Sequence, residues 1–573
     1  MLLVCTNDSQ QRDNQQSMLL LGEWCKSFED NQFWNSSEYE IIPYHWNDRE
    51  KMLRDFDYLN STFDCYIELL TQILNEVHNE QNSTRYWRII LGPWLLFFLH
   101  SLFDRYECLK RACESNYDLI TFLPEGCFVP GSLKEFIHHV QGNHYNALLC
   151  RQVIEYGNLE IKINKLGTPE AETRVEKQLL NPVEIFKIAS HYLAKPFNDI
   201  VIQRSNSNLS YHDFVLLHLK LGLWPAVYPE FHGSNTHLKH SFREQNLGLK
   251  SQDPFFQLID SCLAANLPPY ILESYLSTKR TALSLFPTKC KFIFYSNYYG
   301  DEGVRFFAAN AVNNGSKLIS VQHGGFANTA RYSSGLRLEE SISDYYLTWG
   351  ENIKQGNYNR FFVTKNLPKI RSKQDGPILV GLFSVPHYAF RLDSWIQAGQ
   401  MLAVIKEQIQ FLKNIHKPVQ KLIKLRFHSQ NYWDIKQRIF AEFPKIHHET
   451  IHSQPLYDSL RKSRLFIGTY NTTIMLECFC LNFPILLFWN DNWDEIKSEA
   501  KPYFSELAEA GILWHDPEAC ARHLNSIYND PLKWWLSDRV QNSRRNFMNK
   551  YLRVNSNLLE EFKKLTRKIS DQH

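Results

Sequence analysis

The chain has 573 residues, too many for one hydrophobic core, so two or three domains are expected. Hydrophobic residues make up 44% of the sequence and aromatic residues 14%, which is enough for large cores. Lys and Arg (63) nearly balance Asp and Glu (61), so no broad basic surface for nucleic acid is expected. The 12 cysteines form no CxxC pair, which favours reduced core thiols over metal sites or disulfides and indicates a cytoplasmic protein.

The N-terminal residues predict the start of an α/β domain. Residues 1–6 (MLLVCT) have the pattern of a buried strand and lack the basic and long apolar segments of a signal peptide. The elements expected next are a short strand at 39–44, a charged helix at 48–80, an apolar helix at about 83–105 and a strand at 117–121.

The longest apolar run in the chain, residues 89–103, lies inside the second of these helices. It has 15 residues and contains Pro93 and His100. A membrane-spanning helix needs about 20 apolar residues, so this run is too short to cross a bilayer. We therefore predict a buried helix, with peripheral association at the inner face of the membrane as the alternative.

Residues 125–290 have a less regular pattern. Helical stretches at 183–194 and 213–223 are mixed with a polar segment, and we interpret the range as a helical insertion in the first domain. A regular alternation of strands and helices returns at residue 291, which predicts a parallel sheet with loops after its strands. The expected strand-and-turn segments are 291–300, 316–325 and 344–354, and the expected helix is 301–315.

A polar linker at residues 365–376 separates the first domain, residues 1–364, from a second α/β domain at 377–533. A helical tail with aromatic side chains is expected at 534–573. The predicted fold class is therefore α/β, with two Rossmann-like domains, a helical insertion and a C-terminal helix. In the second domain, strands are expected at 377–388, 421–428, 464–470 and 484–490, and helices at 394–414 and 431–443.

A hydroxyl-rich turn in the second domain predicts an anion site. It lies between the strand at 464–470 and an amphipathic helix, so unpaired N–H groups and the positive end of the helix dipole point at any ligand there. On the neighbouring strand, Arg426 and His428 occupy alternate positions, face the same side and suit a phosphate. The alternatives are a simple helix N-cap in the turn and an Arg–His pair held by local carboxylates. The turn residues proposed to bind the ligand are Thr469, Asn471, Thr472 and Thr473.

Candidates in the first domain follow two strand ends. His323 precedes Gly324 and Gly325, whose missing side chains let the backbone approach a ligand closely. His323 is either a catalytic base or phosphate ligand, or a structural histidine in a tight turn. Glu302 is a second candidate for the base, although a first-turn acid that complements its helix dipole explains it equally simply.

Arg85 and Arg88, in the segment STRYWR, are candidates for binding an anionic acceptor or donor, because a planar guanidinium fits carboxylates and phosphates. The alternative is that these arginines cap a helix or pair with Asp104. The sequence contains no motif that predicts a metal site, and it lacks GxxxxGK[ST], GxGxxG, HExxH and GxSxG. These absences argue against kinases, dehydrogenases, zincins and serine hydrolases.

The order of these segments resembles that of GT-B glycosyltransferases. QHGG at the end of the first domain, then R-x-H, a Ser/Thr-rich turn, a helix carrying Glu477 and a proline-led strand are similar to CMP- and CDP-dependent transferases. These include capsule Kdo transferases, bacterial sialyltransferases and teichoic-acid glycerophosphotransferases. Over roughly residues 1–550, the segments STRYWRIILGPWL, VQHGGF, YYLTWG and GTYNTTIMLE resemble more closely a family of transferases from O-antigen and surface-polysaccharide loci. One departure is His428-Ser429, where the sialyltransferase pattern has His-Pro.

The resemblance implies a metal-independent glycosyltransferase with no cofactor beyond its nucleotide-sugar substrate. The implied donor is a CMP-linked acidic sugar such as Kdo or a nonulosonic acid, and the acceptor is a surface glycan or lipid-linked glycan. Arg426, His428 and the Thr-rich turn would hold the phosphate, with His428 neutralising it as it leaves. Glu477 would bind the ribose, its alternative being an acid that complements the helix dipole. His323 or Glu302 would take the acceptor proton.

Two alternatives remain. The same fold suits UDP- or GDP-sugars, or transfer of a polyol phosphate. A different class is a non-catalytic scaffold of a polysaccharide assembly complex, with the polar residues 203–246 and the aromatic tail as partner surfaces. The retained His, Arg, Thr and Glu set argues against that scaffold.

Overall fold

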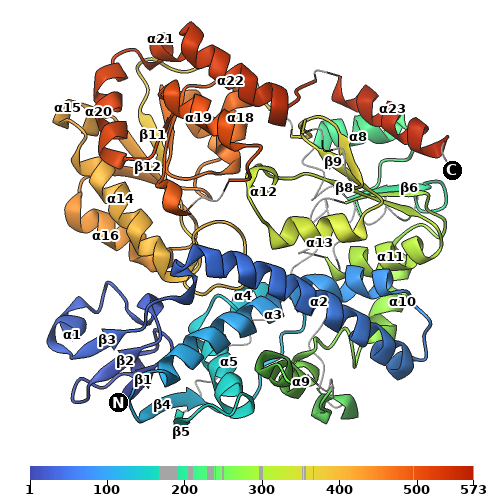
Figure 1. Cartoon of the computed structure of the whole chain (residues 1–573). Helices are drawn as coiled ribbons and strands as arrows, with labels where there is room; N and C mark the ends of the chain where they lie inside the picture. The colour runs from blue at the N-terminus through green and yellow to red at the C-terminus, as the bar shows by residue number, and fades with distance from the viewer. Residues whose placement is uncertain are drawn as a thin grey trace.

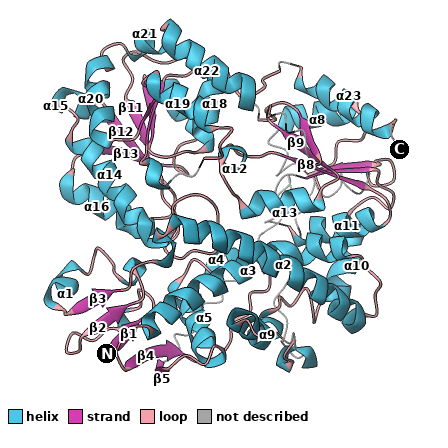
Figure 2. Cartoon of the chain, in the orientation of Figure 1, coloured by secondary structure: helices cyan, strands magenta, loops and turns pink. Residues whose placement is uncertain are grey.

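Three parallel β-sheets with flanking helices build the molecule (Figures 1 and 2). Every strand pairing within these sheets is parallel, which confirms the predicted α/β class. The helix expected at 183–194 falls almost entirely outside the described residues. The computed structural model describes all residues except 167–191, 193, 204–210, 229–230, 232–237, 239, 248–250, 296–300, 352, 354–355, 366, 494–495, 556 and 572–573.

The first sheet has the order β3-β2-β1-β4-β5 and lies at the N-terminus. Its strands are β1 Leu2–Val4, β2 Met18–Leu20, β3 Tyr39–Ile41, β4 Leu119–Pro124 and β5 Ile161–Leu166. The helices around it are α1 Asn31–Ser36, α2 Arg49–His78, α3 Thr84–Cys113, α4 Leu133–His139 and α5 Asn143–Tyr156. The strands predicted at 1–6, 39–44 and 117–121 and both long helices are confirmed.

Helix α3 forms the centre of the molecule, and Figure 1 shows α2 and α3 running between the first sheet and the other two. A helix that is apolar on all sides belongs in a core. Among the described residues, α3 alone is long and apolar enough to cross a membrane, and 94% of its most apolar window is buried in the protein. The prediction of a buried helix for residues 89–103 is confirmed by this burial.

The second sheet has the order β10-β9-β8-β7-β6. Its strands are β6 Ile200–Ile202, β7 Phe292–Tyr295, β8 Lys317–Val321, β9 Tyr345–Thr348 and β10 Tyr358–Arg360. Helices α8 Tyr211–Lys220, α9 Pro254–Asn266, α10 Tyr275–Leu285, α11 Glu302–Asn313, α12 Phe326–Thr329 and α13 Ser334–Ile342 belong to this part of the chain.

The division of residues 1–364 differs from the prediction of one domain with an insertion at 125–290. Strand β5 completes the first sheet and β6 begins the second, and both lie inside that range. The segment therefore builds two separate sheets. The physical reason is that β6 has three residues and β5 (IKINKL) is half polar, so neither has the long apolar run of a central strand.

The third sheet has the order β13-β12-β11-β14-β15-β16 and lies in the predicted second domain. Its strands are β11 Ile378–Gly381, β12 Ile423–Phe427, β13 His447–Thr450, β14 Leu465–Gly468, β15 Ile485–Phe488 and β16 Leu513–Trp514. Its helices are α14 Met401–Lys413, α15 Lys417–Gln420, α16 Ile435–Glu442, α17 Leu456–Lys462, α18 Thr473–Leu481, α19 Lys501–Glu509 and α20 Pro517–Ile527.

The C-terminal tail returns to the second sheet. It consists of α21 Pro531–Trp535, α22 Asp538–Tyr551 and α23 Leu558–Ser570. The ring of Phe562 on α23 lies edge-on to those of Phe294 and Phe361, with centroids 5.7 and 4.9 Å away. Figure 1 shows α23 beside α8 and the second sheet. The expected C-terminal helix that folds back on residues 1–364 is therefore present.

A loop after β11, residues 382–397 (the β11 loop), joins the third sheet to the core helix α3. The Leu392 amide donates to His100 Nδ1 at 2.9 Å, and Arg105 donates to the Ala389 carbonyl at 3.2 Å. Tyr388 donates its hydroxyl to Asn143 Oδ1 at 2.7 Å. These contacts fix the β11 loop, and with it one wall of each pocket described below.

The buried His100 predicts a loss of stability in acid. Burial lowers the pKa of His100 from 6.5 to about 3, so the unfolded chain takes up a proton below pH 6.5 that the folded chain does not. The contribution of neutral His100 is complete above pH 6.5. It falls as the pH drops toward 3, by up to about 1.4 kcal/mol per pH unit. His100→Asn keeps an acceptor for the Leu392 amide but cannot ionise.

Urea unfolding at pH 7.5 and 5.5 is expected to show about 1 kcal/mol less acid destabilisation in His100→Asn than in the wild type. The exposed His144→Asn is the matched control, because it removes a histidine outside the core. An identical pH dependence in wild type and His100→Asn would contradict the prediction.

Candidate functional site

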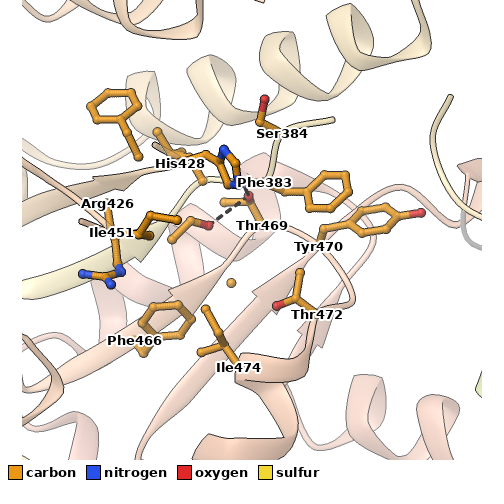
Figure 3. A pocket seen from close by; sticks show the side chains of 14 residues that line it. Phe383, Ser384, Arg426, His428, Ile451, Phe466, Thr469, Tyr470, Thr472 and Ile474 are labelled. Atoms are coloured by element: carbon orange, nitrogen blue, oxygen red, sulfur yellow. Dashed lines mark hydrogen bonds between the residues drawn. The ribbon is translucent and has the colours of Figure 1, made fainter. Parts of the chain in front are cut away.

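Two pockets flank the N-terminus of α18, and each has a volume of about 280 Å³. One, the β12 pocket, opens at the carboxyl ends of β11, β12 and β14 (Figure 3). Its lining is Gly381, Leu382, Phe383, Ser384, Arg426, Phe427, His428, Ile451, Phe466, Gly468, Thr469, Tyr470, Thr472 and Ile474. The lining of the other, the His323 pocket, is Gln322, His323, Gly324, Gly325, Ser333, Gly335, Leu336, Glu339, Tyr346, Arg391, Asp393, Trp395 and Thr473.

The start of α18 separates the two pockets. Thr472 is the N-cap residue and lines the β12 pocket, while Thr473 begins the helix and lines the His323 pocket. The Thr472 side chain makes no capping hydrogen bond. Within the described part of the chain, the amides of Thr473 and Ile474 have no backbone or side-chain acceptor. First-turn amides need a partner, so this helix start can receive an anion.

His428 lies at the end of β12, across the β12 pocket from Thr472 (Figure 3). Its Nδ1 accepts from the Gln430 amide at 3.2 Å, and its ring stacks on Tyr432 with centroids 5.7 Å apart. Burial lowers the pKa of His428, so the ring is neutral at neutral pH. Because Nδ1 is an acceptor, the ring hydrogen is on Nε2, which can donate to an anion in the pocket.

Arg426 also lines the β12 pocket, but a carboxylate already neutralises it. Its Nη1 contacts Glu449 and donates to the Gln454 carbonyl at 2.8 Å. Lys424 Nζ lies 2.6 Å from the other oxygen of Glu449. In Figure 3 the guanidinium points away from His428, so the two side chains do not form the expected joint phosphate clamp. Arg426 is instead held by the local carboxylate of Glu449, which is the alternative expected from the sequence.

Thr469 and Asn471 are buried in the turn after β14. Thr469 Oγ1 donates to the Gly381 carbonyl at 3.1 Å and accepts from the Phe383 amide at 2.9 Å. Gln408 donates to the same oxygen at 3.0 Å. Thr469 therefore ties β14 to the beginning of the β11 loop, and its hydroxyl is fully engaged in shaping the β12 pocket.

Glu477 lies one turn inside α18 and lines neither pocket. Its carboxylate forms an ion pair with Lys365 from the predicted linker, and the glutamate side chain is buried. The structure thus assigns Glu477 a contact that fastens the linker to α18, away from the place expected for a ribose.

The QHGG turn after β8 reaches the start of α18. The Gln322 amide group fixes it: its Nε2 donates to the Gly324 carbonyl at 2.7 Å, and its Oε1 accepts from the Trp349 amide at 2.6 Å. The Gly325 amide donates to Thr473 Oγ1 at 3.4 Å. A Cβ on Gly325 would lie 2.0 Å from a methyl group of Leu476, so glycine is what permits this approach between the second and third sheets.

His323 is partly exposed in its pocket, and Nδ1 lies 3.6 Å from Oε1 of buried Glu339 on α13. The β11 loop supplies the opposite wall. Arg391 Nε lies 2.6 Å from Asp393 Oδ2, and the Arg391 guanidinium stacks over the Trp395 ring at 4.6 Å. Sequence reasoning missed Glu339, Arg391, Asp393 and Trp395 as neighbours of His323. No element was predicted around Glu339, and the β11 loop was divided between an expected strand at 377–388 and an expected helix at 394–414, both of which are shorter in the structure.

Glu302 does not face either pocket, which corrects the expectation that it serves as a base in the cleft. It is fully buried at the start of α11. Its Oε1 accepts from Arg305 Nη2 at 2.7 Å and from the Leu133 amide at 2.9 Å. Arg305, also fully buried, donates in turn to the Ile90 carbonyl at 2.8 Å. Glu302 therefore joins the first two sheets through α3 and α4.

Arg85 and Arg88 lie on α3, where carboxylates hold both. Arg85 Nη2 is 2.7 Å from Asp344, and its Nε donates to the Ile342 carbonyl at 3.0 Å. Arg88 Nη2 is 2.9 Å from Asp64. Neither arginine lines a pocket described here, and their contacts match the structural alternative, with other partners than Asp104.

One group with metal-ligand chemistry occurs among the described residues. His45, Asp104 and Cys108 are buried in the first sheet's core with their ligand atoms within 4.8 Å of one another. The Asp104 carboxylate already contacts the Arg105 guanidinium and accepts from the Tyr44 hydroxyl at 2.7 Å. The Asp104 carboxylate therefore already has a positively charged partner, Arg105.

Comparisons with known proteins place the chain in a family. The model for the LIC12162 family transferases matches residues 1–565. No protein of curated function matches the chain. A solved O-GlcNAc transferase mutant from Thermobaculum terrenum is similar at 12% identity and TM-score 0.32, over 84% of this chain and 90% of that one. A trehalose-phosphate synthase from Burkholderia vietnamiensis is similar at 11% identity and TM-score 0.30, over 52% of this chain and 78% of that one. Similarities this weak carry no argument about function.

Proposed function

We propose, from the premise that this chain belongs to the LIC12162 family of transferases, that it is a glycosyltransferase. It moves a sugar from a nucleotide-activated donor, in our proposal a CMP-linked acidic sugar such as Kdo or a nonulosonic acid, to a surface glycan. One observation carries the proposal: two pockets, built on different sheets, meet at the unpaired first-turn amides of α18. A transferase needs such a junction to hold two substrates next to each other.

The donor occupies the β12 pocket in this proposal. Its walls are largely apolar, with Leu382, Ile451 and Phe466 suited to the faces of a nucleobase. The donor phosphate lies at the start of α18, where the amides and the helix dipole favour negative charge. His428 donates from Nε2 to the same phosphate. Arg426, Thr469 and Asn471 then act indirectly, by fixing the strand ends that form the pocket.

The acceptor occupies the His323 pocket. His323 takes the proton of the acceptor hydroxyl while the hydroxyl oxygen attacks the anomeric carbon of the donor sugar. The bond between that carbon and the phosphate oxygen breaks. The electron pair of that bond goes to the phosphate, whose charge the α18 amides and His428 stabilise. Gly324 and Gly325 keep the two pockets adjacent, because they let the QHGG turn pack against Thr473 and Leu476.

The experiment that tests the donor site is calorimetric titration of the protein with CMP, CDP, UDP and GDP. We expect saturable binding of a cytidine nucleotide. His428→Ala is expected to weaken it by about 10- to 100-fold, because one hydrogen bond to a charged group is lost. His447→Ala is the matched control: His447 is exposed and begins β13, so it lies at the amino ends of the strands, whereas His428 follows the carboxyl end of β12.

Each outcome of this titration decides one part of the proposal. A selective response to UDP or GDP would overturn the cytidine preference and favour another donor on the same fold. Binding that is unchanged in His428→Ala would overturn the β12 pocket as the donor site. No binding of any nucleotide at millimolar concentration would favour the scaffold over the enzyme.

A further inference from the structure

Glu339 is a buried carboxyl group whose side chain lines the His323 pocket. It lies in α13, and its Oε1 has no hydrogen-bond partner among the described residues. A buried carboxylate oxygen without a partner is costly, so it needs an explanation. The polar group that faces it is His323, with Nδ1 at 3.6 Å. This separation is within ion-pair range and longer than a hydrogen bond, so the role inferred below for Glu339 requires the partly exposed imidazole to turn toward the carboxyl group.

The chemistry of the pair depends on which imidazole nitrogen carries the hydrogen. A carboxylate at Nδ1 accepts an N–H there and leaves the lone pair on Nε2. This tautomer is the one that can accept a proton from a hydroxyl. Without the carboxylate, the neutral ring can also adopt the opposite tautomer, which presents an N–H to the acceptor and cannot act as a base.

We infer that Glu339 is a positioning residue for His323: it holds the imidazole with Nε2 toward the acceptor and stabilises the imidazolium formed when the acceptor loses its proton. The inference deepens the proposed function and rests on it. In the step itself, the acceptor O–H bond breaks and its proton moves to Nε2. The acceptor oxygen bonds to the anomeric carbon, and the nucleotide phosphate leaves with the electron pair.

The surroundings of Glu339 determine how the pair titrates. Burial, together with the neighbouring charge of Glu340, raises the pKa of Glu339 well above its ordinary value, while Arg391 of the β11 loop lowers it. Asp393 and Tyr346 are the other titratable groups that line the same pocket. At high pH the His323–Glu339 pair holds one proton, and as the pH falls it readily binds a second. In that form His323 is not a base, so the acid limb of the rate profile reports the pair.

Glu339→Gln tests the inference, because glutamine keeps the size and an acceptor oxygen but cannot carry charge. We expect a fall in kcat of about 10- to 100-fold with little change in the KM of the donor, since general-base catalysis contributes about 10²–10⁴-fold in all. We also expect the acid limb to move to lower pH, because the ring no longer shares a proton with a carboxylate. A merely structural role would change the rate without moving this limb.

Glu340→Gln is the matched control, one residue along the same helix and outside the pocket lining. This substitution removes a negative charge near Glu339 but leaves the carboxyl group of Glu339 in place. We therefore expect a small shift of the acid limb of the pH–rate profile and a nearly unchanged kcat. An equal fall of kcat in Glu340→Gln and Glu339→Gln would overturn the inference.

A second readout does not need substrate. NMR of the His323 imidazole, assigned with His323→Gln, measures its tautomer and titration midpoint in the free protein. In the wild type we expect a midpoint above that of Glu339→Gln, and the hydrogen on Nδ1 at high pH. Equal midpoints and tautomers in the two proteins would overturn the pairing. If the pair is seen but no nucleotide binds, the proposed function fails while the pairing stands.

Discussion

Replacing His323 with alanine is expected to lower the rate of sugar transfer by about 10²–10⁴-fold, the usual contribution of a general base. Nucleotide binding is expected to stay within about twofold of the wild type. A base that acts only in the chemical step changes the turnover and not the affinity for the donor. His323 lines the His323 pocket, outside the β12 pocket proposed for the donor, and is partly exposed, so its removal leaves the core intact. The measurement is CMP release from the proposed donor, CMP-Kdo, with a surface-glycan extract as the proposed acceptor, beside a CMP titration.

His428→Ala is the matched variant for this experiment. It removes a histidine from the other pocket and is expected to lose nucleotide affinity first. The two alanine variants should therefore show crossed defects, one in turnover and one in binding. If His323→Ala weakens CMP binding as strongly as His428→Ala does, both histidines serve the donor and His323 is not the base.

Most interior strands were predictable from the sequence and most edge strands were not, although the edge strand β3 was predicted and the interior strand β2 was missed. Strands β7, β8, β11, β12, β14 and β15 lie inside predicted segments, because a parallel strand buried on both faces reads as a continuous apolar run that ends in polar residues. Strand β13 (HHET) is polar and β16 has two residues, and both occupy edges of the third sheet. Pairing with a neighbour makes such segments strands, and pairing is a tertiary property that local pattern does not contain.

The candidate site shows the same division between local and distant information. Residue types at strand ends were predictable, and His428, Thr472, Thr473, His323 and the two glycines do line the two pockets. The partners that neutralise other candidates were not. Glu477 pairs with Lys365, which is 112 positions away, and Arg426 pairs with Glu449, 23 positions away on another strand. A charged residue looks available in a sequence until the fold supplies its counter-ion.

Glu302→Ala is expected to destabilise the protein by about 3–5 kcal/mol, because it leaves the Arg305 guanidinium buried and without its carboxylate. Both side chains are fully buried, and Glu302 also accepts from the Leu133 amide. Urea unfolding followed by circular dichroism measures the change. Glu50→Ala is the matched control: this exposed first-turn acid of α2 should contribute no more than about 1 kcal/mol through the helix dipole.

A double variant distinguishes the loss of the ion pair from the cost of leaving one buried charge without a partner. In Glu302→Leu with Arg305→Met, no charge is left without a partner, so the loss of stability should be smaller than in Glu302→Ala. The same proteins test the alternative assignment of Glu302 as a base. A base predicts a Glu302→Ala enzyme with normal stability and a large loss of turnover. The buried pair predicts the reverse order: stability falls, and the fraction that remains folded turns over as the wild type does, because His323 and its pocket are unchanged.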